Sequence, residues 1–194
     1  MLFRSPCVLF GVDLVAHLMI SSSPREENKE WRFRPRTFNS TPMSSNASCI
    51  FCKIIKGEIP SFKLIETAKT YSFLDIQPTA KGHVLIIPKH HGAKLHNIPD
   101  DYLSDLLPVV KRLARVLKLD ENNSPDGEGY NVLQNNGRIA HQVVDHVHFH
   151  LIPKRDDKTG LIVGWPAEET NFPKLEEYYN ELKKELEKEE SEKL

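Results

Sequence analysis

The run His-Val-His-Phe-His-Leu-Ile, from His146 to Ile152, constrains the fold more than any other part of this sequence. In a β-strand, side chains two positions apart lie on the same face, so we expect the three histidines on one face and Val147, Phe149 and Leu151 in the core. A row of imidazoles on a sheet needs polar partners, which argues against a packing role. From the pattern alone three interpretations stay open: a solvated surface strand, a tri-histidine zinc hydrolase site, and catalysis by an imidazole that attacks phosphorus.

The rest of the sequence predicts an α+β fold with about five mostly antiparallel strands, one main helix and short helices near both ends. Segments rich in β-branched and aromatic residues, separated by Pro, Gly and Asn, are expected to be strands. They are Phe62–Glu66, Tyr71–Ile76, His83–Ile87, Tyr130–Gln134 and His146–Ile152.

Helical spacing of apolar residues occurs in two places before the histidine run. A short helix is expected from Ile50 to Ile55 and ends at Gly57. The main helix is expected to start at a cap on Asp100 or Asp101 and to kink at Pro108. Its apolar stripe is predicted to comprise Leu103, Leu106, Leu107, Val110, Leu113 and Leu117.

The 194 residues are enough for one well-buried domain, which we place at residues 48–166. Residues 1–47 are expected to be a disordered extension, or sequence upstream of a true start at Met43. The segment Glu121–Gly129 is a polar loop that we expect to be mobile. Residues 167–194 carry ten acidic and five basic side chains, a net charge of −5, and predict a charged helical tail that begins near Pro173. Its narrow apolar stripe, expected to dock by one edge, is Leu175, Tyr179, Leu182 and Leu186.

Composition excludes several classes of protein. The 26 basic and 27 acidic side chains lack the basic excess of a general nucleic-acid binder. No apolar run reaches the roughly 18 residues of a membrane span. Three cysteines are too few for a disulfide scaffold in a chain of 194 residues.

Several blocks in order, together with the histidine run, make the chain resemble the histidine triad superfamily. The blocks are Cys49–Pro60, Phe73–Pro78, Gly82–Lys89, Gln134–Gly137 and His146–Ile152. Within that superfamily the chain is similar to the nucleotide-binding branch, the adenosine 5′-monophosphoramidases, in a fungal-like form. The resemblance extends from about Ser48 to Trp165 and Pro166, and it implies a fold of the histidine triad type.

The resemblance implies distinct roles for the three histidines. His148 would be the nucleophile that attacks the α-phosphorus and forms a covalent nucleotidyl-histidine, which suits a ring that is neutral near pH 7. His150 would contact the phosphate and manage the proton of the leaving group. His146 would orient the row through hydrogen bonds.

The resemblance also implies a binding site for AMP. Asp75 would accept both ribose hydroxyls, between Phe73 and Ile76 as apolar walls around the base. Asn135 and Gln142 would donate amide hydrogens on the phosphate side, and His83 would lie near the phosphate.

The sequence departs from the family pattern just before the histidine run. Where many relatives have Gly-Gln-Ser or Gly-Gln-Thr, this chain has His141-Gln142-Val143, so the hydroxyl that would bond the phosphate is missing. Val143 can still offer its backbone N–H. His141 adds an imidazole that either replaces some of the lost donor capacity or is solvated.

The pair Cys49-x-x-Cys52 indicates zinc or redox chemistry, and the alternative is two small buried thiols at the start of a helix. The resemblance implies a structural zinc held by Cys49, Cys52, His91 and His146. A zinc with four protein ligands has no open position for water, so no cofactor is expected to be required for catalysis.

The resemblance implies a homodimeric enzyme that hydrolyses the P–N bond of adenosine 5′-monophosphoramidate and of AMP-linked amines. Two protomers would form one extended sheet, with the segment around Trp165 reaching towards the partner's active site. A cytoplasmic and nuclear location is expected. Mitochondrial targeting by residues 1–42 is the alternative, although that segment contains four acidic residues.

Rival functions are a dinucleoside polyphosphate hydrolase and a regulatory protein that binds a purine nucleotide with little turnover, docking through its acidic tail. A nucleotidyltransferase is less favoured because a glutamine usually replaces the third histidine there, and His150 is present. DNA deadenylation is disfavoured because a basic zinc-finger extension is missing. Neither a membrane nor a nucleic acid is expected as a partner.

Overall fold

The computed structural model describes residues 42–119, 129–164 and 166–192. The expected extension through residue 41, the polar loop up to residue 128, and Trp165 lie outside the described residues. In chain order the elements are α1 (Ile50–Ile55), β1 (Lys63–Glu66), β2 (Thr70–Leu74), β3 (Val84–Pro88), the 3-10 turn η1 (Leu95–Asn97), α2 (Asp100–Val116), β4 (Gly129–Gln134), the 3-10 turn η2 (Arg138–Ala140), β5 (Phe149–Lys154) and α3 (Phe172–Glu192).

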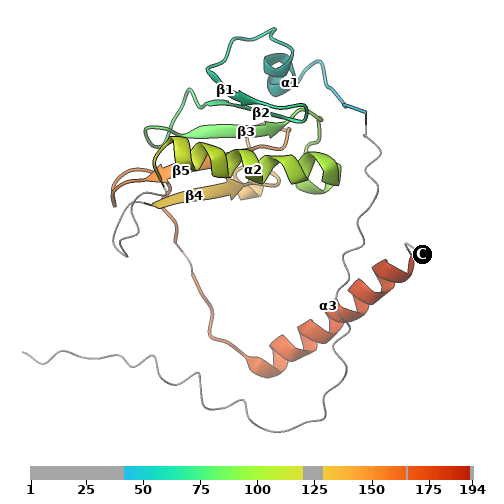
Figure 1. Cartoon of the computed structure of the whole chain (residues 1–194). Coiled ribbons are helices and arrows are strands. Elements are labelled where there is room, and N and C mark those ends of the chain that lie inside the picture. The colour runs from blue at the N-terminus through green and yellow to red at the C-terminus, as the bar shows by residue number, and fades with distance from the viewer. Residues whose placement is uncertain (1–41, 120–128, 165, 193–194) are drawn as a thin grey trace, which may run out of the picture. The chain divides into compact units, whose positions relative to one another are not determined.

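The five strands form one antiparallel sheet in the order β1-β2-β3-β5-β4 (Figure 1). This confirms the predicted α+β fold. The described helices include none that is both long enough and apolar enough to cross a membrane.

Alternate residues of β3 pack in two different hydrophobic cores. Val84 and Ile86 pack against α2, together with Leu151 of β5. Leu85 and Ile87 point to the other face, where the buried residues of α1 cover them. Alternate side chains of β3 therefore pack against α2 on one face and against α1 on the other, as the period of two in a strand predicts.

The predicted strand over His146–Ile152 is wrong at its start, because β5 begins at Phe149. The neighbouring strand β3 ends at Pro88, which has no N–H to continue the ladder. The carbonyl of Pro88 instead faces the ring of His146, with Nε2 of that ring 2.9 Å from the oxygen. Val147 donates its N–H to the carbonyl of Gly92, 2.8 Å away, so this stretch is held by the segment after β3.

Helix α2 differs from its prediction at the cap and in its stripe. Pro99 is the N-cap, so neither aspartate caps the helix; Asp100 and Asp101 lie in its first turn, where the positive end of the helix dipole favours carboxylates. Leu107 is 58% exposed, so its place in the stripe is wrong. The buried face also includes Tyr102, Val109 and Ala114, which complete a stripe about 140 degrees wide at roughly 100 degrees per residue.

Helix α3 confirms the predicted helical tail. All of its residues from Phe172 to Glu192 are exposed. The expected docking of this helix by one edge stays a prediction.

Candidate functional site

The three histidines share one side of the chain although two of them precede β5. Val147 and Leu151 are fully buried in the cores on the α2 side, as predicted. On the opposite side, the ring of Phe51 in α1 lies edge-on to His146 and His148, at centroid distances of 5.8 and 5.3 Å. The extended backbone thus keeps the alternation of a strand without its ladder.

His148 is held in one tautomer by the backbone. Its Nδ1 lies 2.7 Å from the carbonyl oxygen of His146. Since a carbonyl oxygen only accepts, Nδ1 carries the proton and Nε2 keeps its lone pair. The side chain is 5% exposed, and this burial lowers the pKa of His148 below its usual range. The ring is therefore neutral near pH 7, with a nucleophilic Nε2.

A second row of polar side chains begins at His150. Nε2 of His83 lies 2.9 Å from Nδ1 of His150, and the ring of His150 lies 4.9 Å from that of His148. The backbone N–H of Thr79 donates to Nδ1 of His83 at 3.3 Å, so His83 carries its proton on Nε2 and donates it to His150. His150 is then protonated on its own Nε2, the nitrogen free to act as a donor. Burial, followed by the nearby rings of His148 and His83, lowers the pKa of His150 to about 4, so the ring is neutral.

Asp75 lies next to His83, at the end of this row of side chains. One carboxylate oxygen accepts the backbone N–H of Gln77 at 2.9 Å, and the other lies 3.5 Å from Nδ1 of His83. Burial lowers the pKa of His83, while the charge of Asp75 opposes that shift. The carboxylate is 17% exposed and follows the end of β2, so it is oriented yet accessible to a ligand.

Phe73 lies on the same face as the histidines, and the predicted role of Ile76 as a second wall around the base stays a prediction. Phe73 is buried and packs edge-on against Phe51, with ring centroids 5.8 Å apart. Ile76 is 82% exposed. Sequence reasoning missed two residues of this face, Phe51 and Leu85. The register places Leu85 between Phe73 and His150. The alternation of side chains along the expected strand His83–Ile87 was the signal that would have placed Leu85 on this face.

Gln142 takes a structural role, contrary to its expected place as a donor to phosphate. Its side chain is 2% exposed, and its Oε1 accepts the backbone N–H of Gly137 at 2.6 Å. Its Nε2 donates to the carbonyls of Ala93 and Val144, at 2.6 and 3.0 Å. Both amide hydrogens are thus used to hold the loop between β4 and the histidine row.

The other predicted residues of this loop lie near its surface. Asn135 is half-buried and donates to the carbonyl of His141 at 3.5 Å. His141 is exposed and has a φ of 64°, and the role of its ring at the phosphate stays a prediction. Val143 is 81% exposed. Because Gln134 pairs with Phe149, the loop leaves β4 next to the histidine row.

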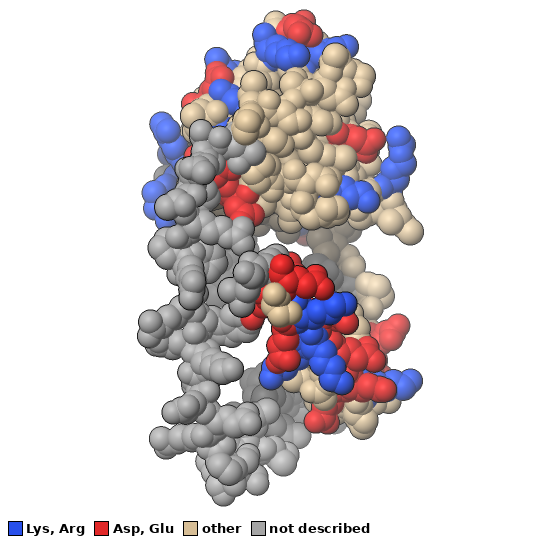
Figure 2. All heavy atoms as spheres, turned by 90° about the vertical axis from the view of Figure 1, so that its right-hand side faces the viewer, with Lys and Arg blue, Asp and Glu red and all other residues tan. Residues whose placement is uncertain are grey.

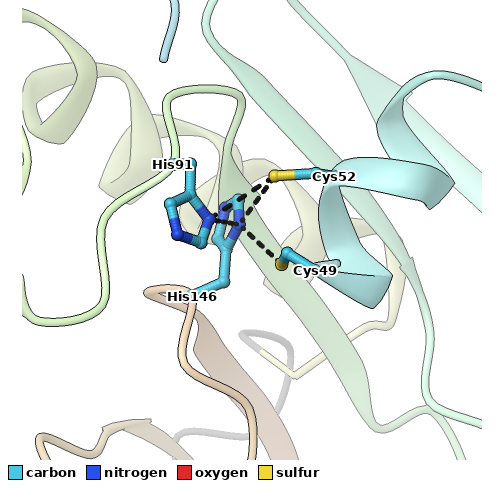
Figure 3. Close-up of side chains that lie close together, drawn as sticks. All are labelled: Cys49, Cys52, His91 and His146. Atoms are coloured by element: carbon cyan, nitrogen blue, oxygen red, sulfur yellow. Dashed lines mark hydrogen bonds between the residues drawn. The ribbon is translucent and has the colours of Figure 1, made fainter. Parts of the chain in front are cut away.

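Cys49, Cys52, His91 and His146 form a group whose ligand atoms all lie within 4.8 Å of one another (Figure 3). Nδ1 of His146 is 3.5 Å from Sγ of Cys49 and 3.6 Å from Sγ of Cys52. Nδ1 of His91 is 3.5 Å from Sγ of Cys52 and 3.2 Å from Nδ1 of His146. Bond lengths of about 2.0–2.3 Å to a tetrahedral zinc would place such atoms about 3.3–3.7 Å apart, so the donor set fits.

The tautomer of His146 also suits a metal. Its Nε2 faces the carbonyl of Pro88 at 2.9 Å and must carry the proton, which leaves the lone pair of Nδ1 directed at the two sulfurs. Burial lowers the pKa of His146 to about 4 and lowers that of His91 as well, so both rings are neutral. Burial raises the pKa of the Cys49 thiol, a cost that a bound cation would offset.

Residues 42–46 lie against this group. The N–H of Asn46 donates to Sγ of Cys52 at 3.4 Å. The N–H of His91 donates to the carbonyl of Ser44 at 2.9 Å. The proposed division of the chain at residues 47 and 48 is still a prediction, but the segment before it contacts the cysteine and histidine side chains.

Comparisons with known proteins agree with the geometry. The family model described as HIT domain matches residues 56–157. The adenosine 5′-monophosphoramidase HNT1 of Candida albicans is 81% identical over 152 residues, which are 78% of this chain and 100% of that protein. The protein of the same name from Saccharomyces cerevisiae is 67% identical over 148 residues, 76% of this chain and 89% of that protein. A crystal structure of a histidine triad nucleotide-binding protein from Candida albicans matches with a TM-score of 0.72 and 83% identity, over 73% of this chain and 99% of that chain.

Proposed function

This chain belongs to the HIT domain family, and on that premise we propose that it is an adenosine 5′-monophosphoramidase. The observation that carries the proposal is the hydrogen bond from Nδ1 of His148 to the carbonyl of His146. It leaves a neutral Nε2 as nucleophile, next to a proton donor on His150.

The proposed reaction has two steps. In the first, Nε2 of His148 forms a bond to the α-phosphorus while the P–N bond breaks, and the departing amine takes a proton from the imidazolium form of His150, which the negative charge of the bound phosphate favours. In the second, water attacks the phosphorus, its proton returns to His150, and AMP leaves with the P–O bond in place of the bond to His148. The row from His150 to His83 supports this exchange, since the ring of His150 is held at Nδ1 throughout.

Asp75 and Phe73 support recognition of an adenosine nucleotide. Among the described residues the carboxylate accepts one backbone N–H, at one of its oxygens, which leaves acceptor capacity for two ribose hydroxyls. The buried aromatic rings of Phe73 and Phe51 offer an apolar surface for the base.

We further propose that Cys49, Cys52, His91 and His146 hold one structural zinc. The spacing of the ligand atoms and the direction of the Nδ1 lone pair of His146 support it. All four positions of a tetrahedral zinc would be filled by protein atoms, so the ion would stiffen α1 and the histidine row without taking part in the reaction.

We also propose that the chain forms a homodimer through β4. This strand is one edge of the sheet, and it contains no charged residue, whereas the other edge, β1, has Lys63 and Glu66. Tyr130 and Val132 of β4 are each 43% exposed. Sedimentation of a Val132→Lys variant is expected to give a smaller species than the unsubstituted protein, and an unchanged species would contradict this interface.

Turnover of an adenylated amine, compared with that of a diadenosine polyphosphate, tests the proposed activity. We expect efficient hydrolysis of the adenylated amine, and efficient cleavage of the diadenosine compound alone would assign the protein to the rival hydrolases. Mass spectrometry of quenched reactions should detect one added AMP on the unsubstituted chain and none on His148→Ala. A His148→Ala variant that retained more than about a hundredth of the activity would contradict covalent catalysis by this residue.

A further inference from the structure

Helix α3 exposes an apolar stripe that no described part of the chain covers. Phe172, Leu175, Tyr179, Leu182 and Leu186 are between 46% and 75% exposed. They recur at alternating spacings of three and four, which is the pattern of the a and d positions of a coiled coil. Single exposed apolar residues are common, but five in register along one helix mark an interaction surface.

The residues beside the stripe are mostly acidic. The helix has eight glutamates and four lysines, and Figure 2 shows acidic side chains over much of its visible surface. At the e and g positions next to the seam stand Glu176, Lys183, Glu185, Glu190 and Glu192, with Tyr178. A partner helix would therefore meet an apolar seam with acidic borders.

The end of α3 is charged in an unfavourable way for a helix alone in water. Its last turn contains no basic residue. The C-terminal end of a helix dipole is negative, so Glu190 and Glu192 are repelled by it. Basic groups of a partner would relieve this repulsion.

A second copy of α3 fits this surface poorly. Parallel pairing would bring Glu185 opposite Glu190, because g and e positions of adjacent heptads meet. Antiparallel pairing would bring Glu176 opposite Glu190. A membrane surface is also unsuitable, since helices that lie on membranes carry Lys and Arg beside their apolar face.

We propose that α3 is a docking helix for a partner protein, and that the partner contributes a basic amphipathic helix. The partner's apolar residues would pack against Leu175, Tyr179 and Leu182. Its lysines or arginines would lie against Glu176 and Glu190. This interaction is separate from the nucleotide site and does not depend on the proposed activity.

Titration of the full chain with two synthetic helices tests the proposal. Both peptides match the 21 residues of α3 and carry leucine at a and d, but one has lysine and the other glutamate at e and g. We expect the lysine peptide to bind at least about tenfold more tightly, and to weaken as salt rises from about 0.05 to about 0.5 M. Equal binding of the two peptides, or binding of neither, would overturn the proposal.

Matched variants test whether the peptides bind to the apolar stripe and to the acidic residues beside it. Leu182→Gln should lose binding, while Asn180→Gln on the opposite face should keep it, with helix content checked by circular dichroism. The double change Glu176→Lys and Glu190→Lys should reverse the preference towards the glutamate peptide. Sedimentation that shows Leu182→Gln to dissociate a self-associated form of the protein would instead assign this surface to a second copy.

Discussion

Replacement of Gln142 by alanine separates a structural role for this residue from a ligand-binding role. The side chain is 2% exposed and makes three hydrogen bonds, two of 2.6 Å and one of 3.0 Å, to Gly137, Ala93 and Val144. Its removal leaves one backbone N–H and two carbonyls without these partners. A buried polar group left unpaired costs about 1–3 kcal/mol, and partial access of water reduces the sum. We expect Gln142→Ala to lower the free energy of unfolding by about 3–5 kcal/mol.

Urea unfolding at neutral pH, followed by circular dichroism, measures this loss. Asn135→Ala is the matched control, since that amide is half-buried and makes a single bond of 3.5 Å, and we expect it to cost less than about 1 kcal/mol. Gln142→Glu keeps the acceptor but loses the donors, so it should be destabilised as well. Titration with AMP completes the test. A Gln142→Ala protein of unchanged stability that bound AMP many times more weakly would refute the structural assignment and restore the role expected from the family pattern.

Three further outcomes follow from the site. Asp75→Ala should weaken AMP binding by about 1.5–3 kcal/mol and remove the preference for AMP over deoxy-AMP, and unsubstituted protein that binds both equally in calorimetry would contradict this role. Purified protein should contain about one zinc per chain by elemental analysis, and Cys52→Ser should lose the metal and melt at a lower temperature while it still turns over; a metal-free chain of unchanged stability would leave the cysteines as packing residues. The folded-state pKa of His150 is about 4 and its ordinary value is 6.5, so the unfolded chain takes up a proton first as pH falls. The free energy of unfolding should therefore fall by about 2 kcal/mol between about pH 6.5 and 4, discounted for partial exposure, and His150→Gln should flatten that dependence in urea titrations at several pH values.

The face of the sheet that each side chain takes was predictable, because it depends only on an extended backbone. Val147 and Leu151 enter the core although β5 starts only at Phe149. The start of the strand was not predictable from the histidine run itself, because it depends on Pro88 in another strand. A residue pattern specifies which face a side chain takes, whereas a ladder needs a partner with free N–H groups.

The candidate site was predictable where chemistry demands a particular residue type. Two cysteines and two histidines brought within 4.8 Å follow from the family pattern. The structural role of Gln142 was not predictable, because a buried amide that bonds three backbone groups has the same sequence signature as one that bonds a phosphate. The prediction that Leu107 is buried was wrong for a similar reason. Spacing places this leucine near the edge of the apolar stripe, and only the width of the packed face decides whether it is covered.

His146 uses its ring and its backbone for different purposes, and this affects how variants of the three histidines should be interpreted. The ring bonds the carbonyl of Pro88 and faces the cysteines, while the carbonyl of the same residue holds Nδ1 of His148. Substitution of the side chain removes the first set of contacts and leaves the second atom in the chain. A loss of activity in His146→Ala would thus measure how far the backbone moves when its ring anchor is gone. The same substitution at His148 removes the reacting atom itself. Equal losses of activity in the two variants would therefore have different causes.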